Sequence, residues 1–292
     1  MLAIIDSGST KADWRIIHPT GEQSEMGTSG FNPFILSTDE IYKSLKQQIN
    51  PAFPLEQFEE IYFYGAGCSD AKRCDMVAEA FRRLFTNAKV VVDHDTIASA
   101  KASCGHQPGI ACILGTGSNS CLYDGQKIVD HITNLGYLVG DEGSGGHLGK
   151  ELLRAYFYRE LPPNMKDAFD ERYPMGERAI LDLLYNKDKP NVFLASFAKF
   201  LSDYKGDPYV RKLIKKCLTE FVNRNLVKYE DHQRLPISFV GSVAFHYKGL
   251  LKECLEEKGM RLGIVIKKPI HNLVDYHLKG KDFVATEDNV VS

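Results

Sequence analysis

The chain has 292 residues, of which 43% are hydrophobic and 25% are charged, and its 36 Lys and Arg residues nearly balance its 38 Asp and Glu residues. This length accommodates two domains of about 150 residues that each bury a core. The net charge of -2 argues against a polyanion-binding surface. Nucleic acid is therefore not an expected partner.

The N-terminal apolar run and the cysteines indicate the cellular compartment. The run at 2–5 is interrupted by Asp6 and lacks a basic flank, so it cannot act as a secretory signal or a membrane span. The seven cysteines include no C-x-x-C pair, which argues against a disulfide framework and a zinc ribbon. We expect a cytoplasmic protein with buried, reduced cysteines and no membrane partner.

The first third of the chain predicts strands and helices in the order βββαβαβα. The expected elements are three strands within 2–26, a helix from Thr38 that ends before Pro51, a strand at 61–64, a helix capped by Ser69 and Asp70, a strand at 90–92 and a small-residue helix at 96–103. The pattern closes near residue 108, which we take as the end of a first lobe.

The second part of the chain repeats this order of elements. Strands are expected at 110–114, around 121–123, and at 128–132, 237–240 and 262–266. A helical insert occupies about 143–235, and its apolar stripe within 209–229 is expected to be core. The sequence predicts an α/β protein with lobes at 1–108 and 109–292 that arose by internal duplication.

The first predicted strand runs into the loop Asp6-Ser7-Gly8-Ser9-Thr10-Lys11. Gly8 lets the backbone approach a phosphate, Ser9 and Thr10 offer hydroxyl donors, and Asp6 is placed to hold Mg²⁺ through its water shell. For a single loop of this kind, a polar β-turn with an exposed aspartate is the simpler explanation. A second loop favours phosphate binding instead.

That second loop is Gly115-Thr116-Gly117-Ser118-Asn119, which follows a fully apolar strand. Two glycines around two hydroxyls form a nest of N–H groups for an anion. The chain has neither a Walker A loop nor a G-x-G-x-x-G motif. Two such loops at corresponding places predict a nucleotide held between two related lobes.

A glycine-rich acidic segment, from Gly140 through Asp141 and Glu142 to His147, opens the next helix. The two carboxylates could simply complement the dipole of that helix. Four glycines in seven residues, however, leave backbone room for a ligand, and we favour ligand binding.

Two further segments follow buried strands. Gly241-Ser242-Val243-Ala244 has the form of an ordinary strand-to-helix cap, which spacing alone favours. Asp95 could likewise be only an N-cap. It also stands at the carboxyl end of a central strand, where open α/β sheets bind ligands.

Together these segments resemble the acetate kinase, sugar kinase, Hsp70 and actin superfamily, and more closely its BadF/BadG/BcrA/BcrD-type ATPase branch. The motifs that carry the resemblance are the first loop at 6–11, the second loop at 115–118, the G-D-E-G-S segment at 140–144 and an adenosine loop at 241–244. The resemblance implies two ribonuclease H-like, actin-like ATPase lobes. It also implies ATP and Mg²⁺ as cofactors, with Asp6 at the metal.

By the same resemblance, the residues that would contact a sugar are Asn32, Asp95, Ser118, Asn119, Gly140 and Asp141. The residues that would bind the nucleotide are Asp6, Gly8, Ser9, Thr10, Lys11, Gly115, Thr116, Gly117, Gly241, Ser242 and Val243. Asp95 would accept the proton of the sugar hydroxyl. The implied activity is phosphorylation of N-acetylglucosamine or a related amino sugar at O6, and a homodimer is suggested by analogy.

Two segments depart from the family pattern. Leu135 stands where relatives often have a tryptophan, and 269–274 reads Pro-Ile-His-Asn-Leu-Val where relatives tend to have Gly-Ala. Two alternatives stay open. One is an ATPase that activates a 2-hydroxyacyl-CoA dehydratase through an iron–sulfur cluster, although no cysteine pair is obviously placed for one; the other is a sugar- or nucleotide-binding sensor without turnover.

Overall fold

The structure is a computed structural model that describes residues 1–186 and 189–287. It consists of two compact units. The first contains Met1–Gln107, Gly125–Lys127 and Lys268–Thr286, and the second contains Pro108–Asp124, Ile128–Lys267 and Glu287. The predicted boundary near 108 therefore separates most of the chain, but residues 268–286 belong with the first unit and not with the second.

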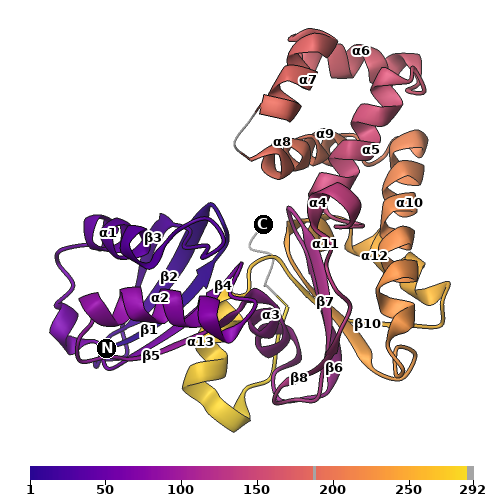
Figure 1. Cartoon of the computed structure of the whole chain (residues 1–292). Helices are drawn as coiled ribbons and strands as arrows, with labels where there is room; N and C mark the ends of the chain where they lie inside the picture. The colour runs from indigo at the N-terminus through magenta and orange to yellow at the C-terminus, as the bar shows by residue number, and fades with distance from the viewer. Residues whose placement is uncertain (187–188, 288–292) are drawn as a thin grey trace. The chain divides into compact units, whose positions relative to one another are not determined.

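The first unit has a five-stranded sheet in the order β3-β2-β1-β4-β5, shown in indigo and purple in Figure 1. Strand β1 is antiparallel to β2 and parallel to β4, and β4 is parallel to β5. The elements are β1 (Leu2–Ser7), β2 (Lys11–Ile17), β3 (Gln23–Ser29), α1 (Thr38–Gln48), β4 (Glu60–Gly65), α2 (Ala71–Leu84), β5 (Lys89–His94), α3 (Asp95–Cys104) and α13 (Ile270–Lys279). This order confirms the predicted βββαβαβα pattern.

Local sequence explains where the helices of this unit begin. At α1, Ser37 and Glu40 form a capping box in which each side chain binds the backbone N–H of the other residue. At α2, Asp70 is the N-cap and accepts a hydrogen bond from the N–H of Arg73. Of the two residues predicted to cap α2, Asp70 does so.

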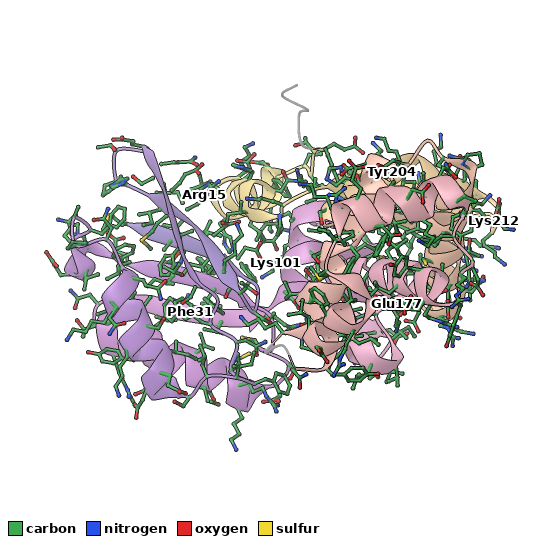
Figure 2. The ribbon with its side chains drawn as sticks, turned by 90° about the horizontal axis from the view of Figure 1, so that it is seen from above. Arg15, Phe31, Lys101, Glu177, Tyr204 and Lys212 are labelled. Carbon is green, nitrogen blue, oxygen red and sulfur yellow. The ribbon has the colours of Figure 1, made fainter. Side chains whose placement is uncertain are left out.

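The two faces of the first sheet have different coverings, because successive residues of a strand point to opposite faces. One face packs a core that includes Ile5, Phe63 and Phe31, and the last of these is labelled in Figure 2. Phe31 meets the ring of Phe81 from α2 edge-on, with centroids 5.9 Å apart. On the other face, Tyr64 hydrogen-bonds through its hydroxyl to Nε2 of His277 in α13, at 2.8 Å.

The second unit repeats the strand order of the first, as β10-β9-β6-β7-β8 with the same parallel and antiparallel pairs. Its elements are β6 (Gly109–Leu114), β7 (Ser118–Tyr123), β8 (Ile128–His131), α4 (Gly136–Val139), α5 (Gly145–Phe157), α6 (Pro163–Arg172), α7 (Gly176–Asn186), α8 (Pro190–Ser196), α9 (Ala198–Asp203), α10 (Pro208–Arg224), β9 (Pro236–Val240), α11 (Ser242–His246), α12 (Lys248–Glu256) and β10 (Arg261–Ile266). The predicted insert is helical, and its apolar stripe on α10 is buried as expected. Among the described residues, no helix has the length and apolar character needed to cross a membrane.

Candidate active site

The first unit carries a row of polar side chains across the carboxyl end of β1. Asp6 of β1 lies directly opposite Asp13 of β2 and Tyr64 of β4, and Tyr64 lies opposite Asp93 of β5. Residues directly opposite each other on neighbouring strands point to the same face. Three carboxylates therefore line one face of the sheet, and Asp95 follows at the first position of α3.

The carboxylates of this row are not equivalent. Desolvation, followed by repulsion from Asp95 and Asp13, raises the pKa of Asp6 to about 7. Burial also opposes ionisation of Asp13, but Lys11 and Lys268 outweigh it and lower the pKa of Asp13. The ammonium groups lie 3.0 and 3.3 Å from the Asp13 carboxylate. Asp6 thus tends to hold its proton up to about neutral pH, whereas Asp13 is ionised and paired.

Asp95 is the other carboxylate that resists ionisation. Desolvation raises its pKa, and attraction from His94 together with hydrogen bonds from Thr96 offsets only part of that effect. The N-cap of α3 is His94, so the simpler explanation of Asp95 as an N-cap is wrong. The strand that precedes Asp95, β5, lies at the edge of the sheet, so the expectation of a central strand is wrong. A carboxylate with a raised pKa beyond the carboxyl end of this strand is suited to accept a proton.

The first predicted loop is a tight hairpin between β1 and β2. The N–H of Gly8 donates to the carbonyl of Lys11 at 3.0 Å, and Lys11 is the first residue of β2. The loop rests on Gly30, since a Cβ there would lie 2.0 Å from the carbonyl oxygen of Gly8. Asn32 donates to the hydroxyl of Ser9 at 2.7 Å. Asn32, a predicted sugar ligand, is thus hydrogen-bonded to the predicted nucleotide loop.

In the second unit, the loop 115–118 is held from below by the start of α5. The N–H groups of Gly145 and Gly146 donate to the carbonyls of Gly115 and Thr116, at 2.8 and 3.0 Å. The N–H of Gly115 itself binds the carbonyl of Gly117. Within residues 1–186 and 189–287, the N–H groups of Thr116 and Gly117 have no protein acceptor. The predicted nest is therefore limited to these two donors.

Asp141 is anchored beside this loop. Its Oδ1 accepts hydrogen bonds from the N–H of Ser118 at 3.0 Å and from Nδ2 of Asn134 at 3.1 Å. The residue is 8% exposed, and its Oδ2 receives no hydrogen bond from the described part of the chain. The N-cap of α5 is Ser144, and no acidic residue lies in the first turn of that helix. The explanation of Asp141 and Glu142 as simple dipole partners is therefore wrong.

Next to the loop lies a cavity of about 410 Å³. Its lining includes Thr116, Ser242, Val243, His246 and Tyr247. Gly241 has a φ of +125°, and a Cβ at this position would lie 2.4 Å from the carbonyl oxygen of Leu114. Only glycine lets the segment 241–243 sit this close to the end of β6. The structure thus brings the predicted adenosine loop and the second phosphate loop to one cavity.

Several residues of these sites were missed by the sequence analysis. The helices α8 and α9 of the insert contribute Ala195, Ala198, Lys199, Ser202 and Asp203 to the nucleoside-sized cavity. Asn134 was noted only as a neighbour of Leu135, although it anchors Asp141. No local pattern marks these residues, because the first five reach the cavity through the packing of the insert and Asn134 lies in the loop between β8 and α4.

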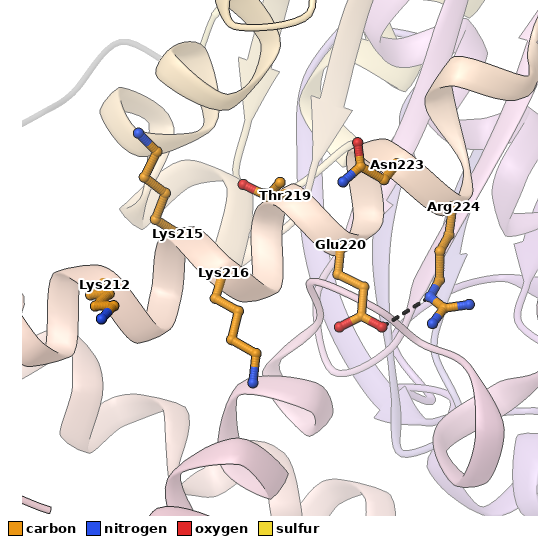
Figure 3. A pocket seen from close by; sticks show the side chains of 7 residues that line it. All are labelled: Lys212, Lys215, Lys216, Thr219, Glu220, Asn223 and Arg224. Atoms are coloured by element: carbon orange, nitrogen blue, oxygen red, sulfur yellow. Dashed lines mark hydrogen bonds and ion pairs between the residues drawn. The ribbon is translucent and has the colours of Figure 1, made fainter.

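Two other hollows of the second unit differ in their relation to the site. One, of about 310 Å³, is lined by Ser118, Asn134, Leu135 and Val139 among others, so it adjoins the partners of Asp141. A larger one of about 590 Å³ runs along α10 (Figure 3) and contains no predicted site residue. Its cations include Lys215, Lys216 and Arg224, each of which pairs with a glutamate. It is not a ready anion site.

Comparison with known proteins places these features in context. The model of the BadF/BadG/BcrA/BcrD ATPase family matches residues 5–274. A protein from Porphyromonas gingivalis assigned as an N-acetylglucosamine kinase is 37% identical and has a TM-score of 0.91, over 96% of this chain and 99% of that chain. A protein of the same assignment from Chromobacterium violaceum is 17% identical, with a TM-score of 0.68 over 94% of this chain and 98% of that chain.

A third similar structure is a ROK family protein from Streptococcus pneumoniae TIGR4, solved in complex with sucrose. It is 12% identical, with a TM-score of 0.50 over 96% of this chain and 99% of that chain. At 17% and 12% identity, the second and third structures show the fold alone. The family match and the first structure extend over nearly the whole chain.

Proposed function

Since the chain belongs to the BadF/BadG/BcrA/BcrD ATPase family, we propose that it is an ATP-dependent sugar kinase that phosphorylates N-acetylglucosamine or a related amino sugar at O6. The observation that carries the proposal is the anchoring of Asp141. One of its oxygens is fixed by Ser118 and Asn134, and the other is left for a ligand. The assignment of the 37% identical relative supports the choice of sugar.

ATP would bind through the second unit and the first loop. The cavity beside Thr116, Ser242 and Val243 is of a size for a nucleoside, and the free N–H groups of Thr116 and Gly117 would bind phosphate oxygens. In the first loop, Gly8, Ser9, Thr10 and Lys11 would contact the phosphates.

Magnesium fits the chemistry of Asp6. The described residues contain no group of three or more His, Cys, Asp or Glu side chains that would hold a metal alone, and Mg²⁺ usually binds one or two carboxylates together with substrate phosphates. Burial and repulsion from Asp95 and Asp13 raise the pKa of Asp6 to about 7, and a cation bound beside these carboxylates would favour the ionised form of Asp6. When bound there, Mg²⁺ would neutralise charge on the phosphates.

Asp95 would act as the proton acceptor for the sugar hydroxyl. Phosphoryl transfer depends mainly on alignment and on charge neutralisation, and a carboxylate within hydrogen-bond reach orients the nucleophile and takes its proton. The raised pKa of Asp95 favours that proton transfer. Asn32, Ser118, Asn119, Gly140 and Asp141 would hold the remaining hydroxyl groups.

An assay of ADP release over hexoses, N-acetylhexosamines and muramic acid derivatives tests the proposal. We expect release that depends on an amino sugar, a 6-phosphate product by ³¹P NMR, and a turnover about 10²-fold lower in Asp95→Ala with sugar binding retained. The exposed Asp75 provides a control as Asp75→Ala. Wild-type turnover in Asp95→Ala would refute the role of Asp95, and the absence of sugar-dependent ADP release would refute the kinase.

The same preparation separates the dehydratase activator from the kinase. An activator that carries an iron–sulfur cluster would be coloured and would contain iron when purified without oxygen. We expect a colourless protein whose ATP hydrolysis responds to sugar and not to a reductant. A cluster absorption band together with reductant-dependent activity would favour the activator instead.

A further inference from the structure

The turn that carries Asp141 is conformationally demanding. Asp141 has a φ of +56° and Gly143 a φ of +71°, and the first of these is unfavourable for a residue with a side chain. The N–H of Ser144 closes the turn by donating to the carbonyl of Asp141 at 3.1 Å. A Cβ on Gly143 would lie 2.9 Å from Cβ of Phe221 in α10. Such a turn keeps its shape only when its surroundings hold it.

His147 supplies that support from the first turn of α5. Its Nδ1 accepts a hydrogen bond from the N–H of Gly143 at 3.0 Å, and the residue is 7% exposed. A backbone N–H is always a donor, so Nδ1 must carry the lone pair and the ring proton must be on Nε2. The backbone of the turn therefore selects one tautomer of the imidazole.

The opposite side of the ring faces a carboxylate. Nε2 of His147 lies 3.7 Å from Oε2 of Glu220 on α10. Glu220 is bound in turn by Nε of Arg224 at 2.9 Å, the contact drawn as a dashed line in Figure 3. An anion beside Nε2 favours the same tautomer that the N–H of Gly143 requires.

We propose that His147, as the neutral Nε2–H tautomer, is a positioning residue that fixes Asp141 for the sugar, an inference that rests on the proposed kinase function. His147 does not touch the substrate in this role. It acts through the N–H of Gly143, two residues beyond Asp141, so its loss lets the strained turn relax and moves the carboxylate that would bind a sugar hydroxyl.

The nucleotide loop is held independently of the ring. The carbonyls of Gly115 and Thr116 are bound by the N–H groups of Gly145 and Gly146, and the His147 side chain takes no part in these bonds. Removing the imidazole should therefore weaken sugar binding while leaving ATP binding nearly intact. This separation distinguishes a positioning role from a general structural one.

The role also has a pH dependence. The charged groups that face His147 are Glu220 of α10, Glu151 and Lys150 of α5 and Glu142 of the turn. Burial outweighs the glutamates and lowers the pKa of His147, so the ring is neutral at pH 7. Protonation in acid places a proton on Nδ1 against the N–H of Gly143, and two donors repel. The KM for sugar should therefore rise as the pH falls below the ordinary pKa of histidine.

Two substitutions test this. His147→Leu removes the acceptor and leaves the buried N–H of Gly143 without a partner, so we expect a KM for sugar about 10-fold higher, an unchanged KM for ATP and a kcat within about 3-fold. His147→Asn places an amide oxygen near the position of Nδ1, and this side chain does not titrate. We therefore expect His147→Asn to restore the KM for sugar and to abolish the rise of that KM at low pH, which we call the acid limb. His232→Leu, in the loop after α10, is the matched control.

NMR with ¹⁵N-labelled histidine reads the tautomer directly in the wild-type protein. The inference is overturned if Nδ1 of His147 carries the proton at pH 7, if His147→Leu leaves the KM for sugar unchanged, or if His147→Asn is as impaired as His147→Leu. Should His147→Leu not fold, an acid limb shared by wild type and His147→Asn overturns it. Absence of turnover by the wild type with every sugar is instead a failure of the proposed function, on which the inference depends.

Discussion

The two sheets share one topology but differ in the row of residues that crosses the end of their first strands. In the first unit, the row runs Asp13, Asp6, Tyr64 and Asp93. In the second unit, the residues at the corresponding positions are Asn119, Ile113, Val240 and Ile266.

One row is acidic and the other is almost wholly apolar. The first unit offers carboxylates, whereas the second offers backbone N–H groups, a cavity and the separately anchored Asp141. The comparison teaches that the repeated strand order places the candidate binding residues at the same edge of each sheet. The side chains in the row at that edge decide whether a unit offers carboxylates or backbone N–H groups. Four experiments can break or sharpen this conclusion.

The largest effect is expected from replacing Asp6, for which the described part of the chain supplies no ion pair. Asp6→Asn should lower turnover by about 10²–10³-fold, because charge stabilisation at a transferred phosphoryl group is lost. Asp13→Asn is the matched variant in the same row and should cost less than about 10-fold, since Lys11 and Lys268 already neutralise Asp13. Initial rates of ADP release over a range of Mg²⁺ concentrations measure both. Equal losses of turnover in the two variants would show that turnover depends on the position of a carboxylate in the row and not on whether a lysine already neutralises it.

The next effect concerns the glycine on which each loop rests. A Cβ at Gly241 would lie 2.4 Å from the carbonyl oxygen of Leu114, and one at Gly30 would lie 2.0 Å from that of Gly8. We expect Gly241→Ala and Gly30→Ala each to lower the free energy of unfolding by about 3 kcal/mol. Urea denaturation measures the change.

Gly249 of α12 serves as the control for these two variants, because a Cβ there meets nothing within 4 Å. Gly249→Ala should be stabilising by about 0.5–1 kcal/mol. If all three alanine variants have the stability of the wild type, close contact at the loops is not required in either unit.

A smaller effect is expected on the stability of the first unit in acid. His277 of the first unit has its pKa lowered to about 4 by burial and by Lys101, which is labelled in Figure 2. The unfolded chain binds a proton at about pH 6.5, so the contribution of His277 to stability is complete above that pH and is lost as the pH falls through 4. We expect a loss of about 1–2 kcal/mol, allowing for partial exposure of the ring.

Thermal unfolding of the wild type and His277→Phe between pH 7 and 4 measures this contribution. The raised pKa of Asp6 changes the stability with pH in the opposite sense. Both proteins contain Asp6, so the difference between the two curves isolates the contribution of His277. Hydrogen exchange should show that acid opens the first sheet before the second. Parallel curves for the two proteins would contradict the assignment to His277.

The smallest effect tests the cavity of the second unit. Ala198 of α9 lines it, so Ala198→Leu should raise the KM for ATP about 10-fold through lost space, with the KM for sugar as the internal control. A rise in the KM for sugar alone would move the nucleoside out of this cavity.

Local pattern was sufficient for much of the fold. Alternating and helical periodicity gave the strand and helix order, and buried strands followed by glycine and hydroxyl residues indicated both loops. The sequence analysis placed α13 in the second lobe by its position in the chain, and only the packing of His277 against Tyr62 and Tyr64 assigns it to the first sheet. Asn134 and Ala198 were not predicted as site residues for a related reason, since each lies in a segment that has no motif of its own.

The return of residues 268–286 to the first unit has a consequence for biosynthesis. On the ribosome, β1 to α3 emerge before the second unit, yet the face of their sheet that carries Tyr62 and Tyr64 waits for α13, which is translated after every strand of the second sheet. The stretch 108–267 contains nearly all of the second unit and can close its own core sooner. The second unit is therefore expected to mature before the first, in contrast to the usual N-terminal-first order.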